Sequence, residues 1–167
     1  RGPGSALYGS NALFAVISVV TKNGQDYRGL ELSGEIASFD AERSRITYGN
    51  VFDSGLDLLV SGTYYDRDGE TLYYREFDDP STNNGRVEND DDDFKSFLIK
   101  TSISDFALTA AHVGREKGIP TAPWDTVFGD RGTRTWDYDD LIGLTYQHDF
   151  PDDFSIQAKL SYNRYDY

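Results

Sequence analysis

The stretch Phe154–Asn163, with the sequence FSIQAKLSYN, alternates between apolar and polar residues. Successive side chains of a β-strand point to opposite faces, so this alternation predicts a strand with one apolar and one polar face. Similar patterns recur in six other segments, at 28–39, 42–53, 56–66, 94–104, 106–116 and 136–149. The sequence therefore predicts an all-β fold of about seven antiparallel strands, each about ten residues long.

The connections between these strands are of two kinds. Short turns are expected at Asp53, Ser104 and Phe150, and long polar loops near 66–93 and 116–135 fall at the opposite end, together with a short turn at Asp40. Transmembrane β-barrels have this asymmetry, with short turns on the periplasmic side and long loops outside. Aromatic residues near the predicted strand ends fit the interfacial girdles of such barrels: Phe39, Phe52, Tyr64, Tyr65, Phe106, Phe154, Tyr162 and Tyr165. The pattern favours a sector of a larger antiparallel transmembrane barrel. A soluble or surface-attached β-sandwich that binds a ligand such as a carbohydrate would share the alternation and is the alternative.

Composition limits the possible functions. The net charge of −13 argues against a nucleic-acid partner, which would require a basic surface. The chain has no cysteine, which excludes disulfides and thiol chemistry, and no methionine, which leads us to expect a fragment or a processed piece. No apolar run reaches the length of a transmembrane helix.

The first twenty-two residues differ from the rest of the chain. The segment 1–11 is rich in Gly and Ser and suits tight turns, whereas LFAVISVV at 13–20 is a short run rich in β-branched residues. That run predicts a strand buried on both faces, ended by a turn signal at 21–24.

This stretch resembles the end of the plug domain of TonB-dependent outer-membrane receptors. The resemblance is carried by Arg1-Gly2-Pro3, Ser5, Leu7-Tyr8-Gly9, Ala12, Val16-Ile17 and Thr21-Lys22. The sequence departs from the family pattern at Ala15, where Gly is usual, and at Ser18, where Asn is common. The resemblance implies the C-terminal end of a plug domain at 1–27, followed at 28–167 by the first strands of a larger barrel.

The resemblance also implies a function. Receptors of this family take up scarce nutrients, such as ferric siderophores or cobalamin-like compounds, across the outer membrane of Gram-negative bacteria. Their partners are the ligand, the outer-membrane lipid and the TonB–ExbB–ExbD energy-coupling complex. Residues of the matching motif would contact the barrel from the plug: Arg1, Gly2, Pro3, Tyr8 and Gly9.

Two outer loops contain candidate binding residues. The acidic loop offers carboxylates that could supply the oxygen ligands of Ca²⁺, at Asp78, Asp79, Asp90, Asp91, Asp92 and Asp93. The alternative is a solvated loop whose like charges repel one another. The second loop offers aromatic faces and cations for a ligand, at Trp124, Phe128, Arg131, Arg134 and Trp136, or these side chains pack the loop against its neighbours.

Enzyme signatures are scarce in this sequence. The two histidines, His112 and His148, lie in different predicted strands, and neither has a Cys or acid at metal-ligand spacing. We therefore expect no enzyme activity and no cofactor, apart from the possible calcium ion.

Overall fold

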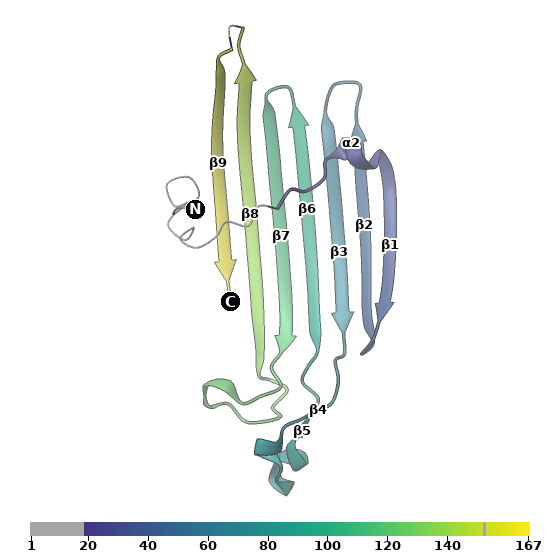
Figure 1. Ribbon diagram of the computed structural model, residues 1–167, viewed down its shortest axis with the longest axis vertical. Helices are drawn as coiled ribbons and strands as arrows, with labels where there is room; N and C mark the ends of the chain where they lie inside the picture. Colours follow the sequence, from purple (N-terminus) through teal and green to yellow (C-terminus); the bar gives the residue numbers. More distant parts are fainter. Residues whose placement is uncertain (1–18, 152) are drawn as a thin grey trace.

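The computed structural model describes residues 19–151 and 153–167, and its main feature is a single-layered antiparallel sheet (Figure 1). Seven strands lie side by side in chain order. They are β1 (Gly29–Ala37), β2 (Ala41–Val51), β3 (Asp57–Arg67), β6 (Asp92–Ile103), β7 (Phe106–Gly118), β8 (Arg134–Asp149) and β9 (Ser155–Asp166). The predicted all-β fold and its seven strands are confirmed.

Both long connections lie at one end of the sheet, together with the short β1–β2 turn, and the other short turns lie at the opposite end (Figure 1). We call the end with the β2–β3, β6–β7 and β8–β9 turns the turn end, and the opposite end the loop end (Figure 1). At the turn end, Gly55 has φ 81°, and its amide donates to the carbonyl of Phe52 over 2.9 Å. Ser104, with φ 51°, and Asp105 link the paired residues Ile103 and Phe106. The short turns predicted at Asp53 and Ser104 are therefore present.

The strand register gives the sheet two chemically different faces. One row across the sheet contains Leu32, Ile46, Gly62 and Phe97, and the parallel row one residue away contains Ser33, Arg45, Thr63 and Ser96. We call the side of the first row the apolar face and the side of the second row the polar face. On the apolar face, Leu32 is 70% exposed and Leu160 is 73% exposed. The buried hydrophobic residues among those described are only Ala41, Leu59 and Val87, so the sheet has almost no core of its own.

Two of the predicted girdle aromatics lie on the other face. Tyr65 pairs with Phe94 across β3 and β6 on the polar face, and their rings stack with centroids 5.0 Å apart. The hydroxyl of Tyr165 donates to Asp137, also on the polar face. The face on which a strand residue lies depends on whether its position is odd or even in the alternation, and closeness to a strand end does not determine it.

The strands at the loop end are longer than the sequence pattern indicates. β3 continues to Arg67, β6 begins at Asp92, β7 continues to Gly118 and β8 begins at Arg134. These extensions are rich in charge, which hides the apolar–polar alternation, but cross-strand ion pairs such as Arg115–Asp92 support them. The first long loop also has structure: the hairpin β4 (Leu72–Tyr73) with β5 (Arg86–Val87), and the 3₁₀ turns η1 (Arg75–Phe77) and η2 (Pro80–Gly85). A third 3₁₀ turn, η3 (Pro123–Asp125), lies in the second long loop.

The N-terminal part differs from the prediction where it is described. Val19 and Val20 belong to no strand and are 79% and 91% exposed, so the predicted strand does not extend to them. The rest of that strand lies outside the described residues. The predicted turn at 21–24 leads into a short helix, α2 (Gly24–Tyr27). No helix within the described ranges is long and apolar enough to cross a membrane.

Candidate functional site

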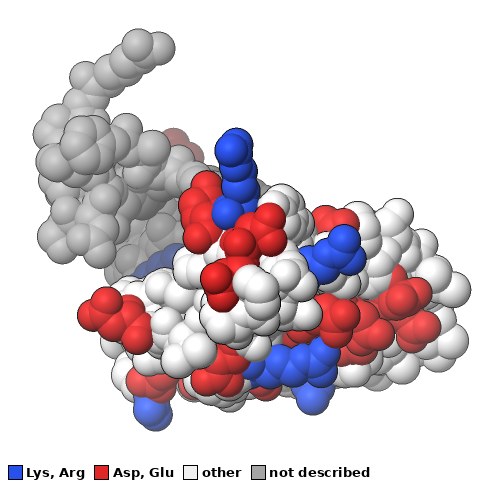
Figure 2. Space-filling model, turned by 90° about the horizontal axis from the view of Figure 1, so that it is seen from below, with Lys and Arg blue, Asp and Glu red and all other residues white. Residues whose placement is uncertain are grey.

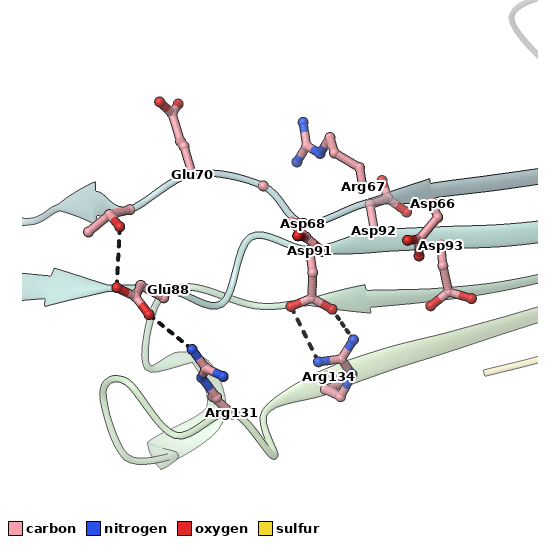
Figure 3. A pocket seen from close by; sticks show the side chains of 12 residues that line it. Asp66, Arg67, Asp68, Glu70, Glu88, Asp91, Asp92, Asp93, Arg131 and Arg134 are labelled. Atoms are coloured by element: carbon pink, nitrogen blue, oxygen red, sulfur yellow. Dashed lines mark hydrogen bonds and ion pairs between the residues drawn. The ribbon is translucent and has the colours of Figure 1, made fainter. Parts of the chain in front are cut away.

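A hollow of about 560 Å³ opens at the loop end, between the long loops and the strand ends (Figure 3). Three separate parts of the chain supply its walls: the end of β3 with the residues after it, the segment from Glu88 into β6, and the loop before β8. The charged side chains of the wall are Asp66, Arg67, Asp68, Glu70, Glu88, Asp91, Asp92, Asp93, Arg131 and Arg134. Seven of these side chains are acidic and three are arginines, so negative charge dominates the hollow.

Arg134, at the start of β8, joins the strand ends below the hollow. Its guanidinium bonds to both carboxylate oxygens of Asp91 and also pairs with Glu116 on β7 (Figure 3). The partial burial of Asp91 would raise its pKa, but the hydrogen bond and the positive charge of Arg134 outweigh burial, so the pKa lies below its ordinary value. Asp91 is therefore ionised at neutral pH and holds Arg134 in place.

Asp90 lies between two cations that come from different strands. It accepts from Arg67 of β3 over 2.9 Å and from Lys117 of β7 over 2.7 Å. The three side chains are each about one-fifth exposed. Such partly buried pairs hold their geometry better than fully solvated ones, so they fix the chain where it enters β6.

Buried Asn89 ties the two long loops together. This residue is 1% exposed, and its side-chain NH₂ donates to the carbonyls of Ile119, Asp130 and Thr133 at 2.9, 3.3 and 3.0 Å. Its side-chain oxygen has no hydrogen-bond partner among the described residues. The amide thus adds donors to three backbone carbonyls of the second loop, of which those of Asp130 and Thr133 also accept from backbone amides of the same loop.

Aromatic packing adds a second tie between the loops. Phe128 of the second loop stacks on Phe77 of the first, with centroids 4.1 Å apart and planes at 8°. The Tyr74 ring meets the edge of Phe128 at 6.0 Å. The two loops therefore form one cap on the loop end, which we call the loop cap (residues 68–91 and 119–133).

Four carboxylates of the hollow are left without an ion pair among the described residues. These are Asp66, Asp68, Glu70 and Asp93, whereas all three arginines of the wall are paired. Asp66 and Asp93 face each other across β3 and β6 (Figure 3). Seen from the loop end, acidic residues outnumber the basic ones beside them (Figure 2). The unpaired charge favours a ligand with a cationic or hydrogen-bond-donating group and disfavours an anionic one.

The six candidate calcium ligands do not converge. Asp78 accepts from the Tyr73 hydroxyl over 2.9 Å, and Asp79 caps η2 by accepting from the Ser81 amide over 2.8 Å. Asp90, Asp91 and Asp92 are engaged by cations, as described above, and Asp93 lies on the wall of the hollow. In residues 19–151 and 153–167, no group of three or more His, Asp or Glu side chains is arranged to hold a metal ion. The calcium site stays a prediction.

The five candidate ligand-binding residues of the second loop take different positions. Arg131 and Arg134 line the hollow, whereas Phe128 packs inside the loop cap. Trp124 is 77% exposed in η3, and Trp136 lies on the apolar face of β8, opposite Glu116. Only the two arginines therefore meet at one site. Asp66, Asp68 and Glu70 were not among the predicted site residues: Asp66 and Asp68 with Gly69 match only the start of an EF-hand loop, because too few ligand positions follow them.

A second feature lies on the polar face at the turn end, where the chain enters the sheet. The amide of Gly24 in α2 donates to Asp57 of β3 over 2.7 Å. The ammonium group of Lys100 in β6 donates to Asn23 Oδ1 and to the carbonyls of Thr21 and Lys22 at 2.7, 3.0 and 3.1 Å. Both Asp57 and Lys100 belong to the polar face, so residues 21–27 lie against that face. The predicted plug–barrel contacts Arg1, Gly2, Pro3, Tyr8 and Gly9 lie outside the described residues.

Comparison with known proteins gives no further guide, because no family model, curated protein or solved structure matches the chain.

Proposed function

We propose that the chain is part of a TonB-dependent receptor of the outer membrane, comprising the end of the plug domain and the first strands of the barrel. In this proposal the parent protein takes up a scarce nutrient, such as a ferric siderophore or a cobalamin-like compound. The observation that carries it is the difference between the two faces: residues 21–27 pack on the polar face, and the apolar face is exposed. A barrel with a plug requires this arrangement, since lipid covers its outside and the plug fills its inside.

The height of the apolar face supports a position in a bilayer. On β8, Tyr146 and Trp136 both lie on the apolar face and are ten positions apart. At about 3.3 Å per residue and a strand tilt of about 40°, they would be about 25 Å apart in height, which is the height of the apolar band of outer-membrane barrels. Within the band, the polar side chains of His112 and Asp140 hydrogen-bond to each other over 2.7 Å, so each has a partner on the apolar face.

A soluble sandwich explains these observations less well. Its two sheets bury their apolar faces against each other. Among the described residues no second sheet covers the apolar face, and Leu30, Ile36 and Leu160 are each more than 60% exposed. An uncovered apolar surface of this kind would make a soluble protein aggregate.

The hollow would face the outside of the cell, because it lies at the end opposite α2 and the short turns. The loop cap would then be where a ligand first meets the receptor. The unpaired carboxylates of the hollow favour a nutrient complex that carries amine or other hydrogen-bond-donating groups.

Uptake by the host bacterium tests the proposal. Deleting the parent gene should abolish transport of one nutrient from a panel of ferric siderophores and cobalamins, and deleting tonB should abolish the same transport. The protein should fractionate with the outer membrane and require detergent for extraction. Recovery of the full-length protein in the soluble fraction, with nutrient uptake unchanged by the deletion, would overturn the proposal in favour of a soluble binding module.

A further inference from the structure

Residues 21–27 are held to the polar face by two attachments that differ in kind. The first, which we call the clip, consists of α2 with Asp57 and Gly49. The second, which we call the strap, consists of Lys100 with residues 21–23. Because they lie next to each other in the chain, a pull on the segment before residue 21 reaches the strap first.

The clip depends on close backbone contact. Gly24 is buried, and a Cβ placed on it would lie 2.2 Å from the carbonyl oxygen of Leu58. A Cβ on Gly49 would lie 2.8 Å from the carbonyl oxygen of Gly24 and from the Cβ of Tyr27. The amide of Gly24, and more weakly that of Gln25, donates to Asp57. The contact consists of many short-range interactions, so moving α2 away from the sheet would break several of them together.

The strap depends on a single ammonium group. An ammonium group has three donors, and Lys100 directs all three at oxygens of residues 21–23. These bonds are exposed to solvent, and the side chains of Val19 and Val20 just before them are exposed as well. A flexible, solvated lysine can exchange each of these acceptors for water at small cost.

We propose that the strap is a releasable attachment, which opens while the clip stays closed. Lys100 is a positioning residue in this proposal: it holds the chain across β6 until tension or thermal motion frees residues 19–23, and α2 remains on β3 as the fixed end. The proposal deepens the proposed function, because the pull on a plug by TonB would supply the tension, but the attachment itself exists without any transport.

Spin labels at two positions test the proposal. The chain has no cysteine, so a single Cys at Val20 reports on the strap and a single Cys at Gln25 reports on the clip, both at exposed sites. The full-length protein is studied in detergent, with and without Lys100→Met. We expect the label at position 20 to lose its immobile spectral component in the Lys100→Met protein, and the label at position 25 to keep it.

Matched variants complete the experiment. Lys95→Met removes a lysine from the same strand but from the apolar face, and should leave both spectra unchanged. Asn23→Asp keeps a side-chain acceptor for Lys100 and an N-cap residue for α2, so it should leave both spectra unchanged. In the Lys100→Met protein, equal mobilisation of both positions would mean that the clip and the strap are one cooperative attachment. No change at position 20 would mean that Lys100 does not hold residues 21–23. Either result overturns the inference, and neither depends on whether the protein transports a nutrient.

Discussion

The two ends of the sheet hold the chain by opposite means. At the turn end, α2 fits against β2 and β3 because two glycines let backbone approach backbone. At the loop end, ion pairs, one buried amide and an aromatic stack join residues that lie 18 to 51 positions apart in the sequence, with charge supplying most of the contacts. The attachment at the turn end is lost when a side-chain atom is added to a glycine. The attachment at the loop end is lost when an interacting side chain is removed.

This difference indicates how each end can tolerate change. A site without room for a Cβ accepts almost no substitution, whereas a network of solvated pairs loses its members one at a time. We therefore expect a steep response to mutation at the turn end and a graded one at the loop end. The following experiments test that contrast.

The largest effect is expected for Gly24→Val. The new side chain would collide with the backbone of β3, where Leu58 cannot move without breaking strand pairing. Overpacking of this kind costs about 1–3 kcal/mol, and because the obstacle is backbone we expect about 3 kcal/mol of the free energy of unfolding to be lost. Urea unfolding of the protein in detergent measures it.

Gly34→Ala is the control for this experiment. A Cβ on Gly34 meets nothing within 4 Å, so its free energy of unfolding should change by less than about 0.5 kcal/mol. Equal losses for the two variants would show that glycine acts through chain flexibility and not through close approach.

An intermediate effect is expected for Asn89→Ala in the loop cap. The substitution leaves the carbonyls of Ile119, Asp130 and Thr133 without their shared donor. The carbonyls of Asp130 and Thr133 keep their backbone donors, whereas that of Ile119 loses its donor. Leaving a buried acceptor unsatisfied costs about 1–3 kcal/mol, so we expect about 2 kcal/mol of local stability to be lost. Hydrogen exchange at the amides of Ile119 and Thr133 should speed up about 30-fold, since 1.4 kcal/mol is tenfold.

Strand exchange rates provide the control for Asn89→Ala. Amides in the middle of β6 and β7 should keep their rates, because the loop cap contributes nothing to pairing there. If these amides also exchanged faster, the cap and the sheet would unfold as one unit, and the contrast between the two ends would be lost.

The sequence predicts the two ends unequally. Alternation is a local signal, and it located the seven strands, their faces and the short turns at Gly55 and Ser104. The loop cap is not local: Asn89 finds its acceptors 30 to 44 positions away, and Phe77 finds Phe128 across the other loop. No pattern within one loop contains that information, so a dense run of acids is compatible both with a metal site and with a solvated loop.

The position of the hollow was also out of reach of pattern analysis. Their charge makes Arg131 and Arg134 candidate binding residues, but the acids that surround them come from β3 and from the entry to β6. Only the strand register brings Asp66 opposite Asp93. In the same way, Lys100 and Asp57 look like ordinary polar residues of alternating strands until residues 21–27 are placed against them.

The smallest effect is expected for Asp91→Asn, and it should depend on pH. The pKa of Asp91 in the folded protein lies below its unfolded value of about 3.9, so ionised Asp91 stabilises the fold above that pH, and the stabilisation is lost as the pH falls through the folded pKa. At pH 7 we expect the variant to lose about 1 kcal/mol of loop-cap stability, because the pair with Arg134 is only partly buried. The difference from the unmodified protein should shrink below about pH 4.

Tryptophan fluorescence follows this loss, because both tryptophans, Trp124 and Trp136, lie in or beside the second long loop. Glu88→Gln is the matched control: the Arg131–Glu88 pair spans 3.0 Å at the same hollow, but its side chains are 74% and 63% exposed. Such a pair contributes about 0–1 kcal/mol, so the urea midpoint of this variant should stay close to that of the unmodified protein at every pH. A pH-independent loss for Asp91→Asn would mean that Asp91 acts through its shape alone, and the loop end would then resemble the turn end in depending on fit.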